Sequence, residues 1–111
     1  MVERLIHFID EHYARRLTIH TLAASVGRSK QHVATVFRRE TGETIHRYLT
    51  RVRVHHAAAL IRQGEKIEAV SLLVGYRSKK DFYRHFKQQI GVNPAVYKTA
   101  VSTFASFSND D

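Results

Sequence analysis

The chain has 111 residues, enough for one domain or for two small lobes that share a connecting element. It has no cysteine, which excludes disulfides, thiol nucleophiles and thiolate metal sites, and no apolar run approaches the roughly 20 residues that a membrane-spanning helix needs. A formal net charge of +8 and a sequence pI near 10.2 indicate a polyanionic partner.

Three helices are predicted within the first 43 residues. Apolar side chains repeat at three- and four-residue spacing from residue 2 to about 13, which predicts an amphipathic helix. Thr18 is a good N-cap for a short second helix, and Gly27 ends it because glycine takes a positive φ without steric cost. Ser29 then caps a third helix that ends at Gly42 and has the inward positions Val33, Val36 and Phe37. Two short helices joined by a glycine turn have the outline of a helix-turn-helix.

The rest of the chain predicts four more helices. Thr44 opens a longer helix that Gly64 stops, and a short helix follows from Ile67. Ser78 caps the next helix, and Asn93-Pro94 is a capping residue followed by a proline at the first helical position. Residues 100–111 are weakly patterned, so this tail is expected to fray. The chain is therefore predicted to be all-α, with about seven helices and no strand.

One segment of the chain occurs twice. The sequence SVGRSKQHVATVFRRETG, residues 25–42, recurs as LVGYRSKKDFYRHFKQQIG, residues 73–91. The second copy has one extra residue, Tyr76, between its glycine and its serine. Both copies have a serine, a phenylalanine and a glycine at the same spacing. They are Ser29, Phe37 and Gly42 in the first copy and Ser78, Phe86 and Gly91 in the second. The sequence therefore predicts two copies of one helix-turn-helix scaffold.

An ordered series of residues extends over some fifty positions. The long helix carries Tyr48-Leu49, Arg53-Val54, Ala57 and Leu60-Ile61, and the second copy with its flanks carries Ile67, Val74-Gly75-Tyr76, Ser78, Phe82, Arg84, Phe86-Lys87, Gly91, Asn93-Pro94 and Tyr97-Lys98. This series resembles the DNA-binding domain of the AraC/XylS family of bacterial transcription regulators, and the resemblance covers about residues 2–98. One departure is Ser71, where the family usually has alanine between two packed helices. Serine is small enough to fit there, so the departure weakens packing more than it opposes the resemblance.

The resemblance implies two helix-turn-helix lobes whose recognition helices enter adjacent major-groove segments on one face of DNA. The expected division is an N-terminal lobe (1–43), a linker helix (44–64), a C-terminal lobe (65–99) and a frayed tail (100–111). A helix from residue 44 to about 63 spans roughly 30 Å at 1.5 Å per residue. One turn of B-DNA is about 34 Å, so this length suits two readers one turn apart.

Base reading is expected from the outward face of each recognition helix. In the first lobe the family's base-contacting positions correspond to Gln31, Ala34 and Thr35. Glutamine can bind adenine, and the methyl groups of alanine and threonine can contact a thymine methyl group. The first lobe is therefore expected to discriminate modestly between bases, largely by apolar contact. In the second lobe the outward residues are Lys79, Lys80, Tyr83 and Arg84. Arg84 is the best candidate for a guanine contact. Asp81 has two open interpretations, acceptance from cytosine or a structural role at the helix start.

Phosphate contacts are expected at the helix starts and along the basic flanks. The residues assigned to them are Ser29, Lys30, Arg38, Arg77, Ser78 and Lys87, the two serines through backbone amides. An ordinary solvated surface charge is the alternative for each basic residue. Arg53, inside the linker helix, is expected to have a packed structural role, and Phe37, Phe82 and Phe86 are expected to be core anchors.

No cofactor, metal site or catalytic residue is predicted. The eight histidines are scattered, and the adjacent pair His55-His56 would project in different directions from a helix, which suits one metal ion poorly. No nucleophile elbow, paired carboxylates or phosphate-binding loop is present, so an enzyme is the least favoured class.

The favoured function is a sequence-specific transcription regulator, usually an activator in the family that the chain resembles. Its expected partner is double-stranded DNA, with RNA polymerase as a further candidate, in the cytoplasm of a bacterium at the nucleoid. The effector or dimerisation domain that many family members carry is expected to be absent from this chain. The alternative is a non-specific nucleic-acid-binding or helical protein-interaction module.

Overall fold

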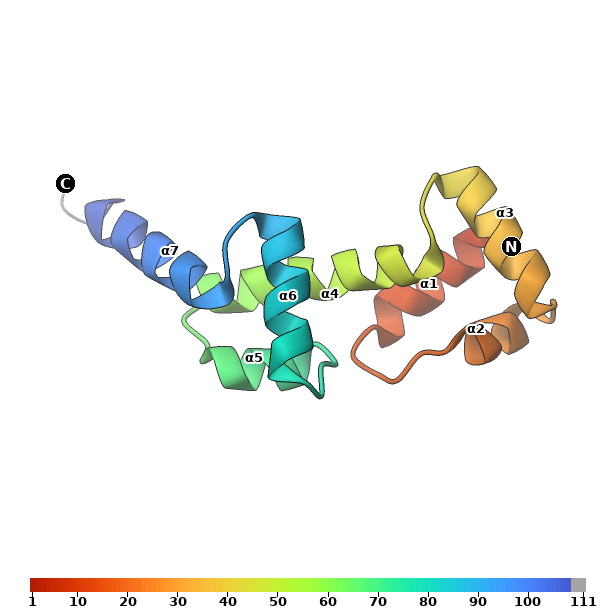
Figure 1. Cartoon of the computed structure of the whole chain (residues 1–111), viewed down its shortest axis with the longest axis horizontal. Helices are drawn as coiled ribbons and strands as arrows, with labels where there is room; N and C mark the ends of the chain where they lie inside the picture. The colour runs from red at the N-terminus through yellow and green to blue at the C-terminus, as the bar shows by residue number, and fades with distance from the viewer. Residues whose placement is uncertain (109–111) are drawn as a thin grey trace. The chain divides into compact units, whose positions relative to one another are not determined.

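The computed structural model describes residues 1–108, and these residues form seven helices and no strand (Figure 1). The all-α prediction is therefore confirmed for the described part of the chain. The helices are α1 (Val2–His12), α2 (Ile19–Val26), α3 (Lys30–Thr41), α4 (Ile45–Arg62), α5 (Ile67–Leu73), α6 (Lys79–Ile90) and α7 (Pro94–Ser108). The chain divides into two compact units, Met1–Arg53 and a second unit that begins at Val54, so the boundary falls inside α4.

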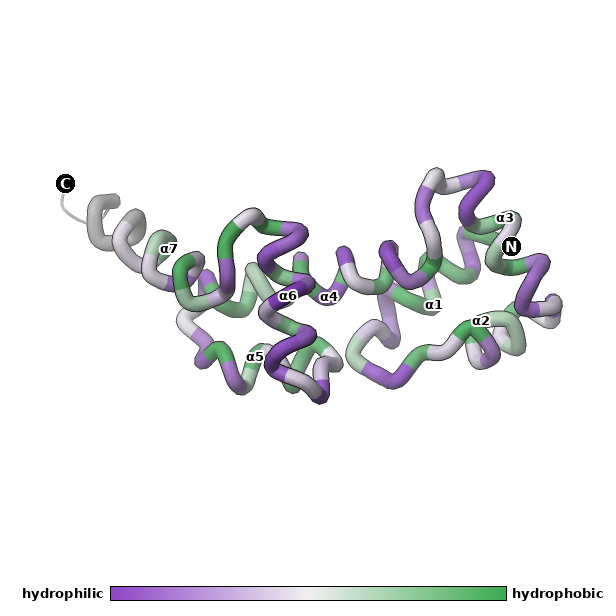
Figure 2. The backbone as a smooth tube through the Cα atoms, viewed as in Figure 1, coloured by the Kyte–Doolittle hydropathy of each residue, from purple (hydrophilic) through white to green (hydrophobic). Residues whose placement is uncertain are grey.

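The core of the first unit is built from one apolar stripe on each of its helices. Figure 2 shows hydrophobic and hydrophilic stretches alternating along these helices, as the spacing of their apolar residues predicts. Leu5 and Ile9 of α1, Val33 and Phe37 of α3 are fully buried, with Leu22 of α2 almost so. Burial of each such side chain contributes about 1.5–3 kcal/mol, so this cluster holds the three helices together.

The turn between α2 and α3 has the geometry that the sequence predicts. Thr18 caps α2 by accepting a hydrogen bond from the backbone N–H of Thr21 at 3.1 Å. Gly27 lies in the left-handed region with φ 66°, and its N–H donates to the carbonyl of Ala24. Residues with a side chain rarely adopt this φ, so the glycine allows the chain to leave one helix and begin the next within three residues.

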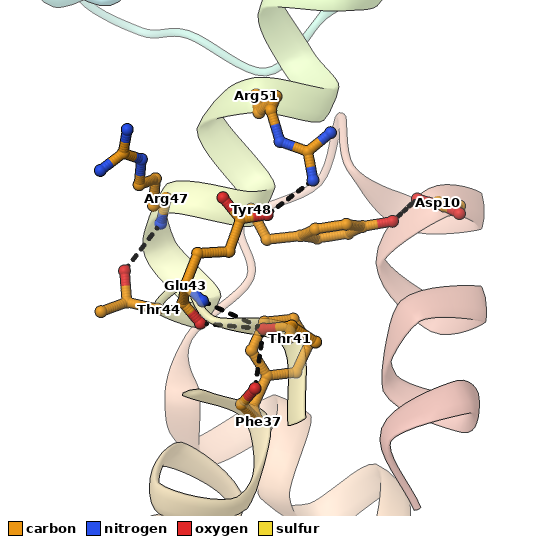
Figure 3. A network of polar contacts seen from close by, with 8 residues as sticks. All are labelled: Asp10, Phe37, Thr41, Glu43, Thr44, Arg47, Tyr48 and Arg51. Carbon is orange, nitrogen blue, oxygen red and sulfur yellow. Dashed lines mark hydrogen bonds and ion pairs between the residues drawn. The ribbon is translucent and has the colours of Figure 1, made fainter. Parts of the chain in front are cut away.

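Polar contacts attach the start of α4 to the rest of the first unit (Figure 3). The hydroxyl of Tyr48 donates to Oδ1 of Asp10 on α1 at 2.8 Å. Burial of the phenol and this hydrogen bond raise the pKa of Tyr48 to about 12. Arg51 donates to Oε1 of Glu43 at 2.6 Å, and its guanidinium also lies over the Tyr48 ring, 5.1 Å from the ring centre. These contacts attach the first turns of α4 to α1 and to the segment that precedes α4.

Arg53 has the structural role that the sequence predicts for it. Its Nε donates to the carbonyl of Tyr13 at 2.7 Å, and its Nη2 donates to the carbonyl of Arg15 at 2.9 Å. Both carbonyls belong to the segment after α1, which continues to α2 without regular structure. The side chain therefore ties this segment to α4.

Arg53→Met should lower the free energy of unfolding by about 1–3 kcal/mol, because two hydrogen bonds from a charged donor are lost. Arg47→Met on the same helix is the matched control, since the exposed Arg47 side chain makes no hydrogen bond or ion pair within residues 1–108. Urea unfolding followed by circular dichroism measures both variants. Equal stability of the two variants would contradict the role assigned to Arg53.

The second unit packs α5, α6 and α7 around the C-terminal part of α4. Val70, Val74, Phe82 and Phe86 are fully buried. The Phe86 ring lies 5.8 Å from that of Phe82 and 5.4 Å from that of Tyr97, centre to centre. Phe37, Phe82 and Phe86 are therefore core anchors, as predicted. Ser71 is also buried, at 7% exposure, so serine does fit between the packed helices.

The last helix is longer than the sequence pattern indicates. Asn93 accepts a hydrogen bond from the backbone N–H of Val96 at 2.9 Å, and Pro94 is the first residue of α7, as predicted. The helix then continues to Ser108, through most of the segment 100–111 that the sequence analysis expects to fray. No glycine or proline occurs between residues 95 and 108, so no residue in this segment ends the helix earlier. Residues 109–111 lie outside the described residues.

Candidate nucleic-acid interface

The exposed face of α3 carries all three residues predicted to read bases in the first lobe. Ser29 caps the helix, accepting a hydrogen bond from the backbone N–H of His32 at 3.1 Å. Because Val33, Val36 and Phe37 face the core, the opposite side of the helix is turned to solvent. Gln31, Ala34 and Thr35 lie on that exposed side, together with Lys30 and Arg38.

A concavity of about 450 Å³ borders this face of α3. Ala34, Thr35 and Arg38 form the α3 side of it, and the remaining lining residues are Leu17, Ile19, Leu22, Thr44, Ile45, His46 and Leu49. The lining is mostly aliphatic, with the Arg38 guanidinium as its one permanent cation. Ala34 and Thr35 therefore lie beside aliphatic surface. The apolar base reading expected of this lobe stays a prediction.

The second recognition helix, α6, presents more charge than α3. Ser78 caps it by accepting from the backbone N–H of Asp81 at 3.2 Å, and Phe82 and Phe86 face the core. The side chains predicted to contact DNA that are exposed on α6 are Lys79, Lys80, Arg84 and Lys87, while Tyr83 is half-buried. Each copy of the repeat therefore places its serine at the helix start and its phenylalanine in a core, with an outward face left for a partner.

Contacts between neighbouring side chains on α6 couple its predicted base readers. Arg84 Nη2 donates to Oδ1 of Asp81 at 3.2 Å, one turn earlier on the helix. The ammonium group of Lys79 lies over the ring of Tyr83, 5.5 Å from its centre. The backbone N–H of Asp81 is thus bound by the Ser78 cap and its carboxylate is paired with Arg84, and both interpretations of Asp81 stay open.

The cationic side chains assigned to phosphates are not engaged elsewhere. Within residues 1–108, the side chains of Lys30, Arg38, Arg77 and Lys87 are exposed and make no hydrogen bond or ion pair. Several other cations are occupied by the protein itself: Arg51 pairs with Glu43, Arg53 holds two carbonyls, and Arg62 donates to the Tyr97 hydroxyl at 2.8 Å.

The hydroxyl groups of Ser29 and Ser78 are committed to capping. If these serines contact phosphates, they do so through backbone amides at the helix start, where the helix dipole attracts anions.

Two other kinds of site, a metal centre and a membrane span, are absent from the described part of the chain. Residues 1–108 contain no group of three or more histidine, aspartate or glutamate side chains placed to hold a metal ion. None of their helices is both long and apolar enough to cross a membrane.

The chain matches known proteins over most of its length. A family model described as a helix-turn-helix domain matches residues 22–100. The melibiose operon regulatory protein of Escherichia coli K12 is 32% identical over 98 residues, which cover 87% of this chain and 32% of that protein. Regulatory protein SoxS of Salmonella typhimurium LT2 is 31% identical over 99 residues, 88% of this chain and 92% of SoxS. The chain thus spans about a third of the first relative and nearly all of the second.

The solved structures include one that is bound to DNA. The DNA-binding domain of AdpA, a global transcriptional factor crystallised with a target DNA, superposes with a TM-score of 0.84 at 28% identity. The match covers 89% of this chain and 90% of that domain.

The sequence predicts which faces of α3 and α6 are exposed, but it does not predict the contacts between the side chains on them. The Tyr76 hydroxyl and Nδ1 of His85 on α6 share a hydrogen bond at 2.7 Å, and neither residue is among the site residues predicted above. The sequence offers one sign of this contact: Tyr76 is the residue that only the second copy of the repeat contains.

Proposed function

This chain belongs to the AraC-type helix-turn-helix family of DNA-binding domains, and we propose that it is a sequence-specific transcription regulator that reads DNA with α3 and α6. The observation that carries this proposal is the shared design of the two helices. Each has a serine cap, a buried phenylalanine and an exposed outer face with unpaired cations. A recognition helix needs this combination, a rigid attachment on one side and free donors on the other.

The two helices are proposed to enter adjacent major-groove segments. Support for this comes from α4, which runs without a break from Ile45 to Arg62 and belongs partly to each unit. We further propose that the protein activates transcription, with RNA polymerase as a second partner. The melibiose operon regulatory protein and SoxS are named as regulators, and a third similar protein, from Staphylococcus xylosus, is named as the lactose operon transcription activator.

Arg84→Ala should weaken binding to a selected duplex by about 1–3 kcal/mol and remove the preference at one base position. Lys87→Ala is the contrasting variant on the same helix, expected to weaken selected and random duplexes by similar factors. Fluorescence anisotropy with a panel of single-base duplex variants measures this. If Arg84→Ala weakened every duplex equally, Arg84 would be a phosphate contact.

Hydroxyl-radical footprinting on a bound duplex tests the proposed function. Two protected stretches about one helical turn apart, roughly 10 base pairs between centres, are expected on one face of the DNA. A single protected stretch, or the same affinity for every random duplex, would favour a non-specific nucleic-acid-binding module. Absence of binding to any duplex at low salt would favour a protein-interaction module.

A further inference from the structure

The residue that is extra in the second copy of the repeat connects the core of the second unit to its recognition helix. Tyr76 follows the left-handed Gly75 and is buried, at 6% exposure. Its ring packs against that of Phe82, with 5.3 Å between centres. Its hydroxyl lies 2.7 Å from Nδ1 of His85 on α6, a hydrogen bond between a core side chain and a half-buried one.

The far side of the same imidazole contacts Arg84. Nη2 of Arg84 lies 3.5 Å from Nε2 of His85 and 3.2 Å from Oδ1 of Asp81. A guanidinium has only donors, so this contact is a hydrogen bond in the tautomer whose Nε2 accepts. The imidazole proton is then on Nδ1, which donates to the hydroxyl oxygen of Tyr76. The Tyr76 hydroxyl can donate or accept, so it is compatible with this tautomer of His85.

These contacts hold one nitrogen of the Arg84 fork and leave the others free. Nη2 is shared between Asp81 and His85, while Nε and Nη1 make no hydrogen bond within residues 1–108. The Arg84 side chain is still 59% exposed. A long side chain held at one nitrogen loses less conformational entropy when its remaining donors bind a base.

The first copy of the repeat has no equivalent of this arrangement. It lacks the extra residue, and the positions that correspond to Arg84 and His85 are Thr35 and Val36. Val36 is part of the first unit's core and has no donor or acceptor in its side chain. The chain of contacts is thus specific to α6.

We propose that Tyr76 and His85 are positioning residues for base reading by Arg84: the core tyrosine fixes the imidazole, and the imidazole, with Asp81, orients the guanidinium toward its base. Neither residue touches DNA in this account. This inference rests on the proposed function, since it concerns how one of the proposed readers acquires its selectivity.

Tyr76→Phe is the direct test, because it keeps the buried ring and removes only the hydroxyl. Tyr97→Phe is the matched control in the same unit, since it also removes one hydroxyl, the one that accepts from Arg62. Base preference is measured for each protein with single-base variants of a selected duplex, together with affinity for a random duplex and the melting temperature.

Tyr76→Phe is expected to reduce the preference for one base, at the position that Arg84 reads, by about threefold to tenfold. Coupling energies between neighbouring residues are of this size. Random-duplex affinity and preferences elsewhere should not change, and Tyr97→Phe should leave the whole profile unchanged. His85→Leu, which removes the imidazole and keeps the tyrosine itself, should reproduce the loss if Tyr76→Phe does not fold. In an Arg84→Ala background, neither substitution should have a further effect on the profile.

The possible failures are distinguishable. A flat profile for the unmodified protein would overturn the proposed function and this inference with it. A profile that Arg84→Ala does not alter would overturn the inference alone. The inference would also be wrong if Arg84→Ala removed a preference that folded Tyr76→Phe and His85→Leu both retained.

Discussion

Phe86→Ala is expected to lower the free energy of unfolding of the second unit by about 3–5 kcal/mol, the range measured for large aromatic-to-alanine changes in protein cores. Phe86 has no exposed surface and contacts the rings of Phe82 and Tyr97. Truncation of the Phe86 side chain leaves a cavity between α6 and α7, because the two helices cannot move together far enough to fill it. Small domains have a total stability of about 5–15 kcal/mol, so this one change removes a large part of it.

Urea unfolding at low temperature measures the effect, with Ile90→Ala as the control on the same helix. Ile90 is 37% exposed, and its truncation should cost well under half as much. Because α6 depends on this core, Phe86→Ala should also abolish the base preferences of the second lobe. Equal unfolding energies for the two variants would mean that Phe86 is not the anchor of α6.

The second large effect is a steep loss of DNA affinity with salt. Four exposed cations are assigned to phosphates, Lys30, Arg38, Arg77 and Lys87, and each neutralised phosphate releases condensed counterions. The logarithm of the binding constant should then fall with the logarithm of salt concentration with a slope of about −4. With that slope, affinity would drop about 250-fold between roughly 50 and 200 mM salt.

Titrations at four salt concentrations measure the slope for the unmodified protein and for Lys87→Gln. The variant should reduce the slope by about one. Arg4→Gln on α1, far in sequence from either recognition helix and exposed, should leave it unchanged. A slope near zero for the unmodified protein would be incompatible with phosphate binding by these side chains.

Much of the fold follows from residues whose physical roles are local. Thr18, Ser29, Ser78 and Asn93 begin helices because their side-chain oxygens accept from backbone N–H groups three residues later, and the structure shows each of these bonds. Gly42 and Gly91 end α3 and α6 with φ of 82° and 99°, which their equal spacing in the two copies predicts. Such roles need only the sequence and the helix period.

The contacts within the candidate interface depend on rotamers and on three-dimensional neighbours, and the sequence does not determine them. Asp81 can cap a helix, pair with Arg84 or face DNA, and its spacing is compatible with all three. The bond between Tyr76 and His85 requires knowledge of where the turn after α5 places the tyrosine ring. The extent of α7 was also missed, because its weak apolar pattern contains neither a stop signal nor a strong helix signal before residue 108.

The claim that two unlike recognition helices read adjacent groove segments is tested most directly by selection of bound duplexes from a random pool, followed by sequencing. Two short motifs are expected, with centres about one helical turn apart, and the motif read by α6 should carry more information than the one read by α3. Repeating the selection with Arg84→Ala should weaken only the stronger motif. A single enriched motif, or a pool with no enriched sequence after repeated rounds, would contradict the account.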